Sequence, residues 1–272
     1  QILSCNPRLT MTKNTHAATG APTLPLFYKD PVLLRFEDHG DVGLAPPADF
    51  GFASEAVVIP LCVGEFVPAM RHYPIVFAAD GSASPLVVVG IRQGHNLFVE
   101  RDGGWRAGTY IPAYVRRYPF IGVETPDKAQ QLLTIDRKSN RFVASASART
   151  DAERLFGADG KPTSTAQSAM AFCQAYHADI VNTLAFAKAL GEAKLLTPNH
   201  VQMQFPDGGQ QTLDGFCVVD EKAFRALPAK TVADWHARGW LDLATLHLAS
   251  LQNFQSLLGL NAQRADERKA LA

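Results

Sequence analysis

The tripeptide HGD at residues 39–41 has the spacing of two metal ligands. In this HxD pattern a histidine and a carboxylate bind iron together with a distant second histidine. Alternate side chains of a strand point to one face, so His39 and Asp41 could reach the same ion from an extended segment. His200 or His247 would supply the third ligand. The competing interpretation is a solvated polar turn, since the pattern is short and Glu37 lies beside it.

A second candidate is the segment GTYIPAYVRRYPFIGV, residues 108–123, which combines aromatic rings, two prolines and two adjacent arginines. If the segment is a strand, alternation places Tyr114, Arg116 and Tyr118 on one face and Arg117 on the other. Because proline cannot donate a ladder hydrogen bond, the two prolines favour a strand at the edge of a sheet.

An exposed row of tyrosine and arginine side chains could hold a peptide, a carboxylate or a glycan. The rings would stack on the ligand, and the guanidinium would form paired hydrogen bonds. The alternative is structural: Arg116 and Arg117 would join two subregions through salt bridges to residues such as Glu100 or Asp102.

The elements that must position these residues are mostly strands in the first half of the chain. Runs rich in β-branched residues, separated by turn residues, predict strands at 56–61, 73–79, 85–91, 96–100, 130–136 and 141–147. The sequence around Asp102-Gly103-Gly104 predicts a hairpin, and CVGEFVPAM predicts an early helical turn limited by Pro68.

The periodicity changes after FGADGKPTST, where a helix capped by Ser164 or Thr165 is expected to run towards Gly191. Its predicted buried stripe is Cys173, Tyr176, Ile180, Leu184 and Ala187. A second hairpin is predicted within 201–220, turning at Pro206-Asp207-Gly208-Gly209, followed by short helices and one long final helix from Trp240.

These elements predict an α+β fold: a mainly antiparallel β N-terminal region followed by a helix-rich C-terminal region with a β-hairpin. The expected boundaries are a flexible tail at 1–24, a β-rich region at 25–157, a helical region with the hairpin at 158–260, and a C-terminal tail at 261–272. We expect the two central regions to form one compact unit. Met11 is a plausible natural start, with residues 1–10 as an upstream extension.

The composition restricts the class of protein. Of 272 residues, 47% are hydrophobic and 19% charged, which predicts a soluble globular chain. The formal charge is zero, so nothing global favours nucleic acid as a partner. The sequence has no apolar run long enough to span a membrane, no CxxC pair and no nucleotide-binding glycine motif. The N-terminus lacks the features of a signal peptide, which predicts a cytoplasmic location.

Four stretches carry a further signal when taken together: PLFYKDPVLLRFEDHGDVGLAPPADFGFA, VIPLCVGEFVPAMRHYPIVF, GHNLFVERDGGWRAGTYIPAYVRRYPF, and VDEKAFRALP with WHARGWLDLATLHLASLQNF. They resemble the SapC family of bacterial proteins from about Leu24 to Leu260, and YIPAYVRRYPF is the most specific part. The family is named after genes associated with a paracrystalline surface layer, so the resemblance implies a role at the cell envelope. It supplies no active-site motif.

We therefore expect a soluble accessory protein of the bacterial surface layer or envelope that binds a protein or peptide partner, such as an envelope component, through Tyr114, Arg116, Arg117 and Tyr118. No cofactor is predicted for this function, and the sequence leaves the oligomeric state open. The alternative is a metal-dependent oxygenase or other enzyme acting on a peptide or small metabolite. It would use a divalent metal such as iron.

Overall fold

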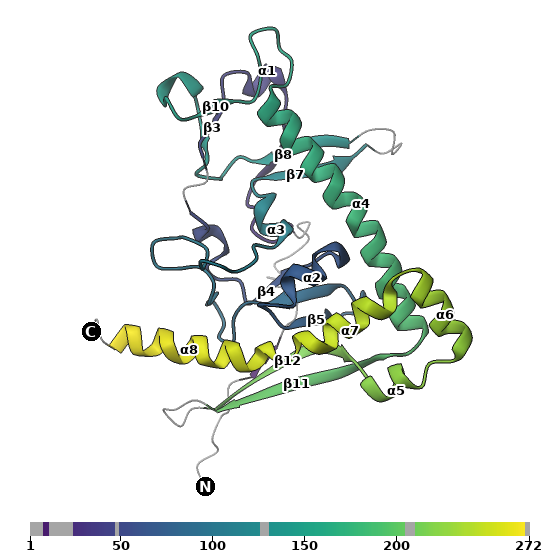
Figure 1. Ribbon diagram of the computed structural model, residues 1–272. Helices are drawn as coiled ribbons and strands as arrows, with labels where there is room; N and C mark the ends of the chain where they lie inside the picture. The colour runs from purple at the N-terminus through teal and green to yellow at the C-terminus, as the bar shows by residue number, and fades with distance from the viewer. Residues whose placement is uncertain (1–7, 11–23, 47–48, 126–130, 205–209, 270–272) are drawn as a thin grey trace, which may run out of the picture.

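The structure, a computed structural model, describes residues 8–10, 24–46, 49–125, 131–204 and 210–269 (Figure 1). The strands are β1 (Arg8–Thr10), β2 (Pro31–Leu33), β3 (Gly43–Leu44), β4 (Val58–Pro60), β5 (Ile75–Ala78), β6 (Pro85–Val88), β7 (Phe120–Glu124), β8 (Gln131–Asp136), β9 (Phe142–Val143), β10 (Glu153–Arg154), β11 (Leu196–Gln204) and β12 (Gln210–Val219). The α-helices are α1 (Phe36–His39), α2 (Phe66–Ala69), α3 (Ala113–Arg116), α4 (Ser164–Glu192), α5 (Glu221–Arg225), α6 (Ala229–Ala237), α7 (Trp240–Ser250) and α8 (Asn253–Lys269). Three 3-10 turns are η1 (Gly51–Ala53), η2 (Val63–Glu65) and η3 (Ala146–Ala148). Strands dominate the first half and helices the second, so the predicted α+β class is confirmed.

The β-branched runs of the first half build one side of a six-stranded sheet. β4, β6, β5 and β12 pair in that order and antiparallel, while β12 also pairs with β11 and, in parallel, with β1. The late hairpin β11–β12 therefore completes a sheet that residues 58–88 begin. The two regions predicted to follow one another in sequence share this sheet.

Two three-stranded sheets form a second layer of structure near α1 and the start of α4 (Figure 1). One has the order β2-β8-β7 and the other β10-β3-β9. The predicted strand at 96–100 is wrong, since only Val99 forms a bridge, with Trp105. The turn itself is as expected, because Glu100 N–H donates to the Gly104 carbonyl at 2.7 Å.

The long helix α4 crosses the molecule and connects two hydrophobic cores (Figure 1). It begins one residue earlier than predicted, because the Thr163 hydroxyl caps it by accepting from Ala166 N–H. Three members of the predicted stripe, Cys173, Tyr176 and Ala187, are buried. Leu184 is exposed, which corrects the prediction for that residue. In that turn of α4 the side chain that faces the core is Thr183, whose hydroxyl accepts a hydrogen bond from Val63 N–H of η2.

The final helical segment consists of two helices, not the single helix predicted. α7 is anchored to the sheet by Ser250, whose hydroxyl accepts from Ile75 N–H at 2.9 Å. The Asn253 amide then donates to the carbonyls of Met70 and Tyr73, and α8 continues from that residue. Residues 261–269, predicted as a tail, are therefore helical. The turn predicted at 206–209 lies outside the described residues.

None of the helices described here is both long enough and apolar enough to cross a membrane.

Phe186 provides a test of the larger core. Its ring is fully buried and makes edge or tilted contacts with Phe66, Phe77 and two tryptophans. Phe186→Ala should lower the free energy of unfolding by about 3–5 kcal/mol, since it removes contacts and leaves a cavity. Urea denaturation followed by circular dichroism measures this. Val181→Ala on the same helix is the control, because Val181 is 57% exposed and its loss should change stability by less than about 0.5 kcal/mol.

Candidate functional site

The segment 108–123 is a helical turn followed by the strand β7, so the prediction of one continuous strand is wrong, while β7 does lie at the edge of its sheet. Pro112 precedes α3, a position where a missing N–H costs no helix hydrogen bond. The chain then turns at Arg117, whose carbonyl accepts from Phe120 N–H at 2.8 Å, and β7 begins. Aromatic residues are common in strands, so the sequence favoured a strand here. Pro112 instead stands at the start of a helical turn.

This turn separates the four predicted binding residues. Tyr114 and Tyr118 are only 6% and 5% exposed, and they lie in the interior. Arg117 is partly buried, while Arg116 is exposed. The four residues therefore do not share an exposed face, which corrects the alternation argument.

Arg117 lies inside a box of tyrosine rings, which we call the tyrosine box. Its guanidinium carbon is 4.1 Å from the ring centre of Tyr114, 4.5 Å from that of Tyr176 and 5.8 Å from that of Tyr28. Its Nε is enclosed, and no acceptor in the described part of the chain hydrogen-bonds to it. Cation–π attraction is stronger when the cation is desolvated, so the rings substitute for a carboxylate partner.

Arg116 is held at the surface. Its guanidinium donates to the Ile111 carbonyl and to the Tyr110 hydroxyl, both at 3.0 Å. The rings of Tyr110 and Phe172 lie 5.6 and 5.3 Å from its guanidinium carbon. Among the described residues neither arginine forms a salt bridge with Glu100 or Asp102, and Glu100 pairs with Arg106 and Arg264.

Glu65 is a buried carboxylate that the sequence analysis missed. It accepts hydrogen bonds from Cys62 N–H, Ala113 N–H and the Tyr110 hydroxyl. Burial raises its pKa, while the donors and Arg116 act against that shift. Its spacing of three residues from Cys62, at the start of a helical turn, is the capping-box signal that could have found it. Glu65 ties η2 to the start of α3 and so fixes Arg116.

The predicted metal ligands are not assembled into one site. His39 ends α1 and does not lie on a strand, and its Nδ1 is 3.1 Å from the Arg35 carbonyl. Asp41 forms an ion pair with Arg154 at 2.9 Å. Among the described residues, no three of His, Cys, Asp and Glu are grouped closely enough to hold a metal ion.

His247 is a structural residue. Its Nε2 accepts from Val219 N–H at 3.0 Å, and its Nδ1 donates to the Ile75 carbonyl at 2.8 Å. It therefore links β12 to β5 with both ring nitrogens in use. Burial lowers its pKa to about 4, so the ring is neutral at neutral pH.

A cavity of about 790 Å³ lies between the two small sheets, and we call it the sheet-edge cleft. Its apolar lining is Val32, Leu33, Val42, Ile135, Phe142, Val143 and Ala144, and its polar lining is Arg35, Asp38, His39 and Arg137. Its volume and its mixture of apolar walls with a few polar groups are typical of ligand sites. The strands β2 and β9, which contribute to the lining, are each the last strand of their sheet.

The outer edge of β2 offers backbone groups to this cleft. Leu34 N–H donates to Leu133, and Arg137 N–H donates to Asp30, both at 2.9 Å. In an antiparallel pair the bonded positions alternate, so Val32 is bonded to β8 and the N–H and C=O of Leu33 point away from it. No strand of the described residues pairs with that side of β2.

Tyr118 supports the cleft from inside. Its hydroxyl donates to the buried carboxylate of Asp136 at 3.1 Å, and the same carboxylate accepts from Asp30 N–H at 2.8 Å. Asp30 in turn pairs with Arg137, at 2.9 Å from Nε and 2.8 Å from Nη2. This chain of contacts holds Arg137 at the wall of the cleft.

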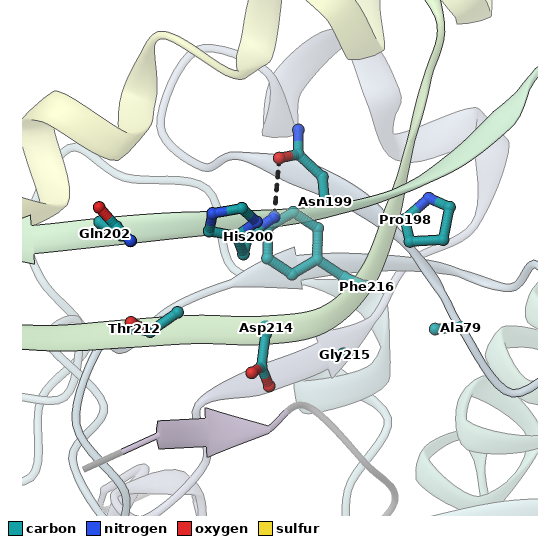
Figure 2. Close-up of a pocket in the computed structure, with 9 residues that line it drawn as sticks. All are labelled: Ala79, Pro198, Asn199, His200, Gln202, Thr212, Asp214, Gly215 and Phe216. Atoms are coloured by element: carbon teal, nitrogen blue, oxygen red, sulfur yellow. Dashed lines mark hydrogen bonds between the residues drawn. The ribbon is translucent and has the colours of Figure 1, made fainter. Parts of the chain in front are cut away.

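A smaller cavity of about 330 Å³ lies on the β11–β12 hairpin (Figure 2), and we call it the hairpin cavity. Its lining includes His200, the other predicted third ligand, together with Asn199, Gln202, Thr212 and Asp214.

Comparison with known proteins gives one match: a family model described as SapC matches residues 34–257. No curated protein and no solved structure matches the chain.

The two neighbouring arginines are predicted to differ in their contribution to stability. Arg117→Ala should lower the free energy of unfolding by about 2 kcal/mol or more, because it empties the tyrosine box. Arg116→Ala, its matched control, should cost less than about 1 kcal/mol, since Arg116 is exposed. Equal losses in urea denaturation would contradict the assignment of Arg117 to the interior.

His247 should make stability depend on pH. Below its unfolded value of 6.5, the unfolded chain takes up a proton that the folded ring resists down to about pH 4. Its stabilising contribution is therefore present above pH 6.5 and should fall by about 3 kcal/mol as the pH drops to 4. His247→Gln should lack this component. Urea denaturation of both proteins at several pH values gives the difference, and a difference that is flat with pH would refute a neutral buried ring.

Proposed function

The chain belongs to the SapC family, and from this premise we propose that it is an accessory protein of the bacterial surface layer or envelope that binds an extended peptide segment of a partner protein. The envelope association rests on the family alone. The peptide-binding role rests on the geometry of the sheet-edge cleft.

The observation that carries the proposal is the pair of sheet edges at the cleft. An extended peptide placed there can hydrogen-bond to the free N–H and C=O of Leu33 on β2. Peptides that add a strand to a sheet gain affinity from such main-chain bonds and specificity from pockets for alternate side chains. The apolar wall formed by Val32, Ile135 and Phe142 supplies such a pocket.

The charges of the lining favour an acidic residue in the bound segment. Arg35 is exposed, and within the described part of the chain its guanidinium has no ion-pair partner. Arg137, whose charge is paired with Asp30, adds a second guanidinium to the lining, and Asp38 is the acidic residue of that lining. The proposed ligand is therefore an extended segment that alternates apolar and acidic side chains.

The four residues first predicted as contacts take different parts in this proposal. Arg116 is proposed as a second direct contact, because its guanidinium lies at the surface between two aromatic rings. Tyr118 acts through Asp136 on the wall of the cleft. Tyr114 and Arg117 act on the loop before β2, through the tyrosine box.

Fluorescence anisotropy with a labelled octapeptide of alternating valine and glutamate tests the proposal. The protein should bind this peptide more tightly than one of alternating valine and lysine. Leu33→Pro removes the outward N–H without removing a ladder bond, and Arg35→Gln removes the free charge. Each substitution should weaken binding by roughly tenfold, as expected for the loss of one hydrogen bond or one charge contact.

Two controls make the result specific. Arg225→Gln on α5 removes an exposed arginine far from the cleft in sequence, and it should leave binding unchanged. A peptide with every backbone amide N-methylated should bind poorly, because neither of its edges can donate a hydrogen bond to a neighbouring strand. Equal binding of the methylated peptide, or no binding of the parent peptide, would reject strand addition at this cleft.

A further inference from the structure

The β11–β12 hairpin contains an irregularity that creates the hairpin cavity. Asn199 is paired with Phe216 and Val201 with Leu213, so the single residue His200 lies opposite both Asp214 and Gly215. The extra residue on β12 is a β-bulge. Gly215 has a φ of 82°, a left-handed conformation that glycine adopts without strain.

The bulge changes which side chains face the core. Leu213 and Phe216 are both buried, and the Phe216 ring stacks on Phe254 of α8 at 5.9 Å. In an unbroken strand these two positions would face opposite sides of the sheet. The extra residue lets both face inward, and it leaves Asp214 on the polar side with Thr212 of the same strand.

Polar side chains from both strands gather at this point. Figure 2 shows His200 and Gln202 on β11 along the same stretch of the hairpin as Thr212 and Asp214 on β12. Asn199 pairs with the inward-facing Phe216, so its side chain extends from the other face of the hairpin, where its oxygen accepts from His200 N–H at 2.7 Å. Bulges are frequent next to binding sites because they redirect side chains in this way.

The lining selects the charge of a ligand. Asp214 is the acidic residue of the lining, and among the described residues no donor hydrogen-bonds to its enclosed Oδ1. An enclosed carboxylate oxygen lacking a donor is costly, and a cationic donor relieves that cost. An anion would be repelled, and the lining offers only His200 and Asp214 as strong metal ligands.

We propose that the hairpin cavity binds an alkylammonium or guanidinium group, with Asp214 as its charge partner and the amide oxygen of Gln202 as a further acceptor. A volume of about 330 Å³ suits one such group and its short alkyl stem. The same chemistry is offered by a lysine or arginine side chain of a partner protein and by a free amine. This site lies on the six-stranded sheet and uses none of the residues of the sheet-edge cleft, so either proposal can fail without the other.

The test uses two probes on the full chain labelled with ¹⁵N: the capped tripeptide Gly-Arg-Gly and free putrescine. Titration followed by NMR should shift the amide signals of residues 199–202 and 212–216. Asp214→Asn should weaken binding by roughly tenfold or more, because it keeps the shape and removes the charge. Asp234→Asn, which neutralises an exposed carboxylate on α6, is the matched control and should bind like the unaltered protein.

The outcomes separate the sources of the ligand. Shifts with both probes support a site for the cationic group itself, and shifts with the tripeptide alone support a partner's side chain. No shift at these residues with either probe overturns the proposal, as does undiminished binding by Asp214→Asn. Thermal unfolding of both variants verifies that they are folded. Lysine in place of arginine in the tripeptide gives an independent measure of the site's preference.

Discussion

The buried carboxylate of Asp136 is the interaction on which the structure around the sheet-edge cleft depends. A charge removed from water needs several donors, and Asp136 receives them from Lys29 N–H, Asp30 N–H, Lys138 N–H and the Tyr118 hydroxyl. These donors come from three separate parts of the chain. The carboxylate therefore fixes the loop before β2 against the end of β8, and the free edge of β2 is held in place because this loop cannot move independently.

Much of the fold could be predicted because it depends on local patterns. β5 and β6 consist of β-branched and aromatic residues between turns, and the capped, periodic sequence of α4 specifies a helix almost to its ends. The sheet order could not be predicted in this way. β12 joins β5 through a pairing of residues more than a hundred positions apart, and no local pattern encodes that distance. Similarly, Leu184 has the residue type and spacing of the buried stripe predicted for α4. However, η2 packs against the neighbouring Thr183, and Leu184 is left exposed.

The candidate sites were harder to predict, for a related reason. The sequence identified Arg116 and Arg117 as unusual, yet adjacent residues of a helical turn point in directions that strand alternation does not describe. The sheet-edge cleft is lined by β2 and β9, of three and two residues, together with α1 and the end of β8, and elements as short as β2, β9 and α1 leave no periodic signal. The bulge at Gly215 was visible only as an ordinary turn-forming residue within a hairpin. In each case the site depends on which segments, distant in the sequence, pack against each other, and local sequence patterns do not encode that packing.

The tyrosine box has a consequence for the conditions under which the protein can work. Burial raises the pKa of each of its three tyrosines, so these rings stay neutral well into the alkaline range, and arginine does not lose its proton in proteins. Dissolved ions reach an enclosed contact much less than an exposed pair. The guanidinium of Arg117 inside the tyrosine box therefore keeps its positive charge at acidic and at alkaline pH, and high ionic strength screens it little.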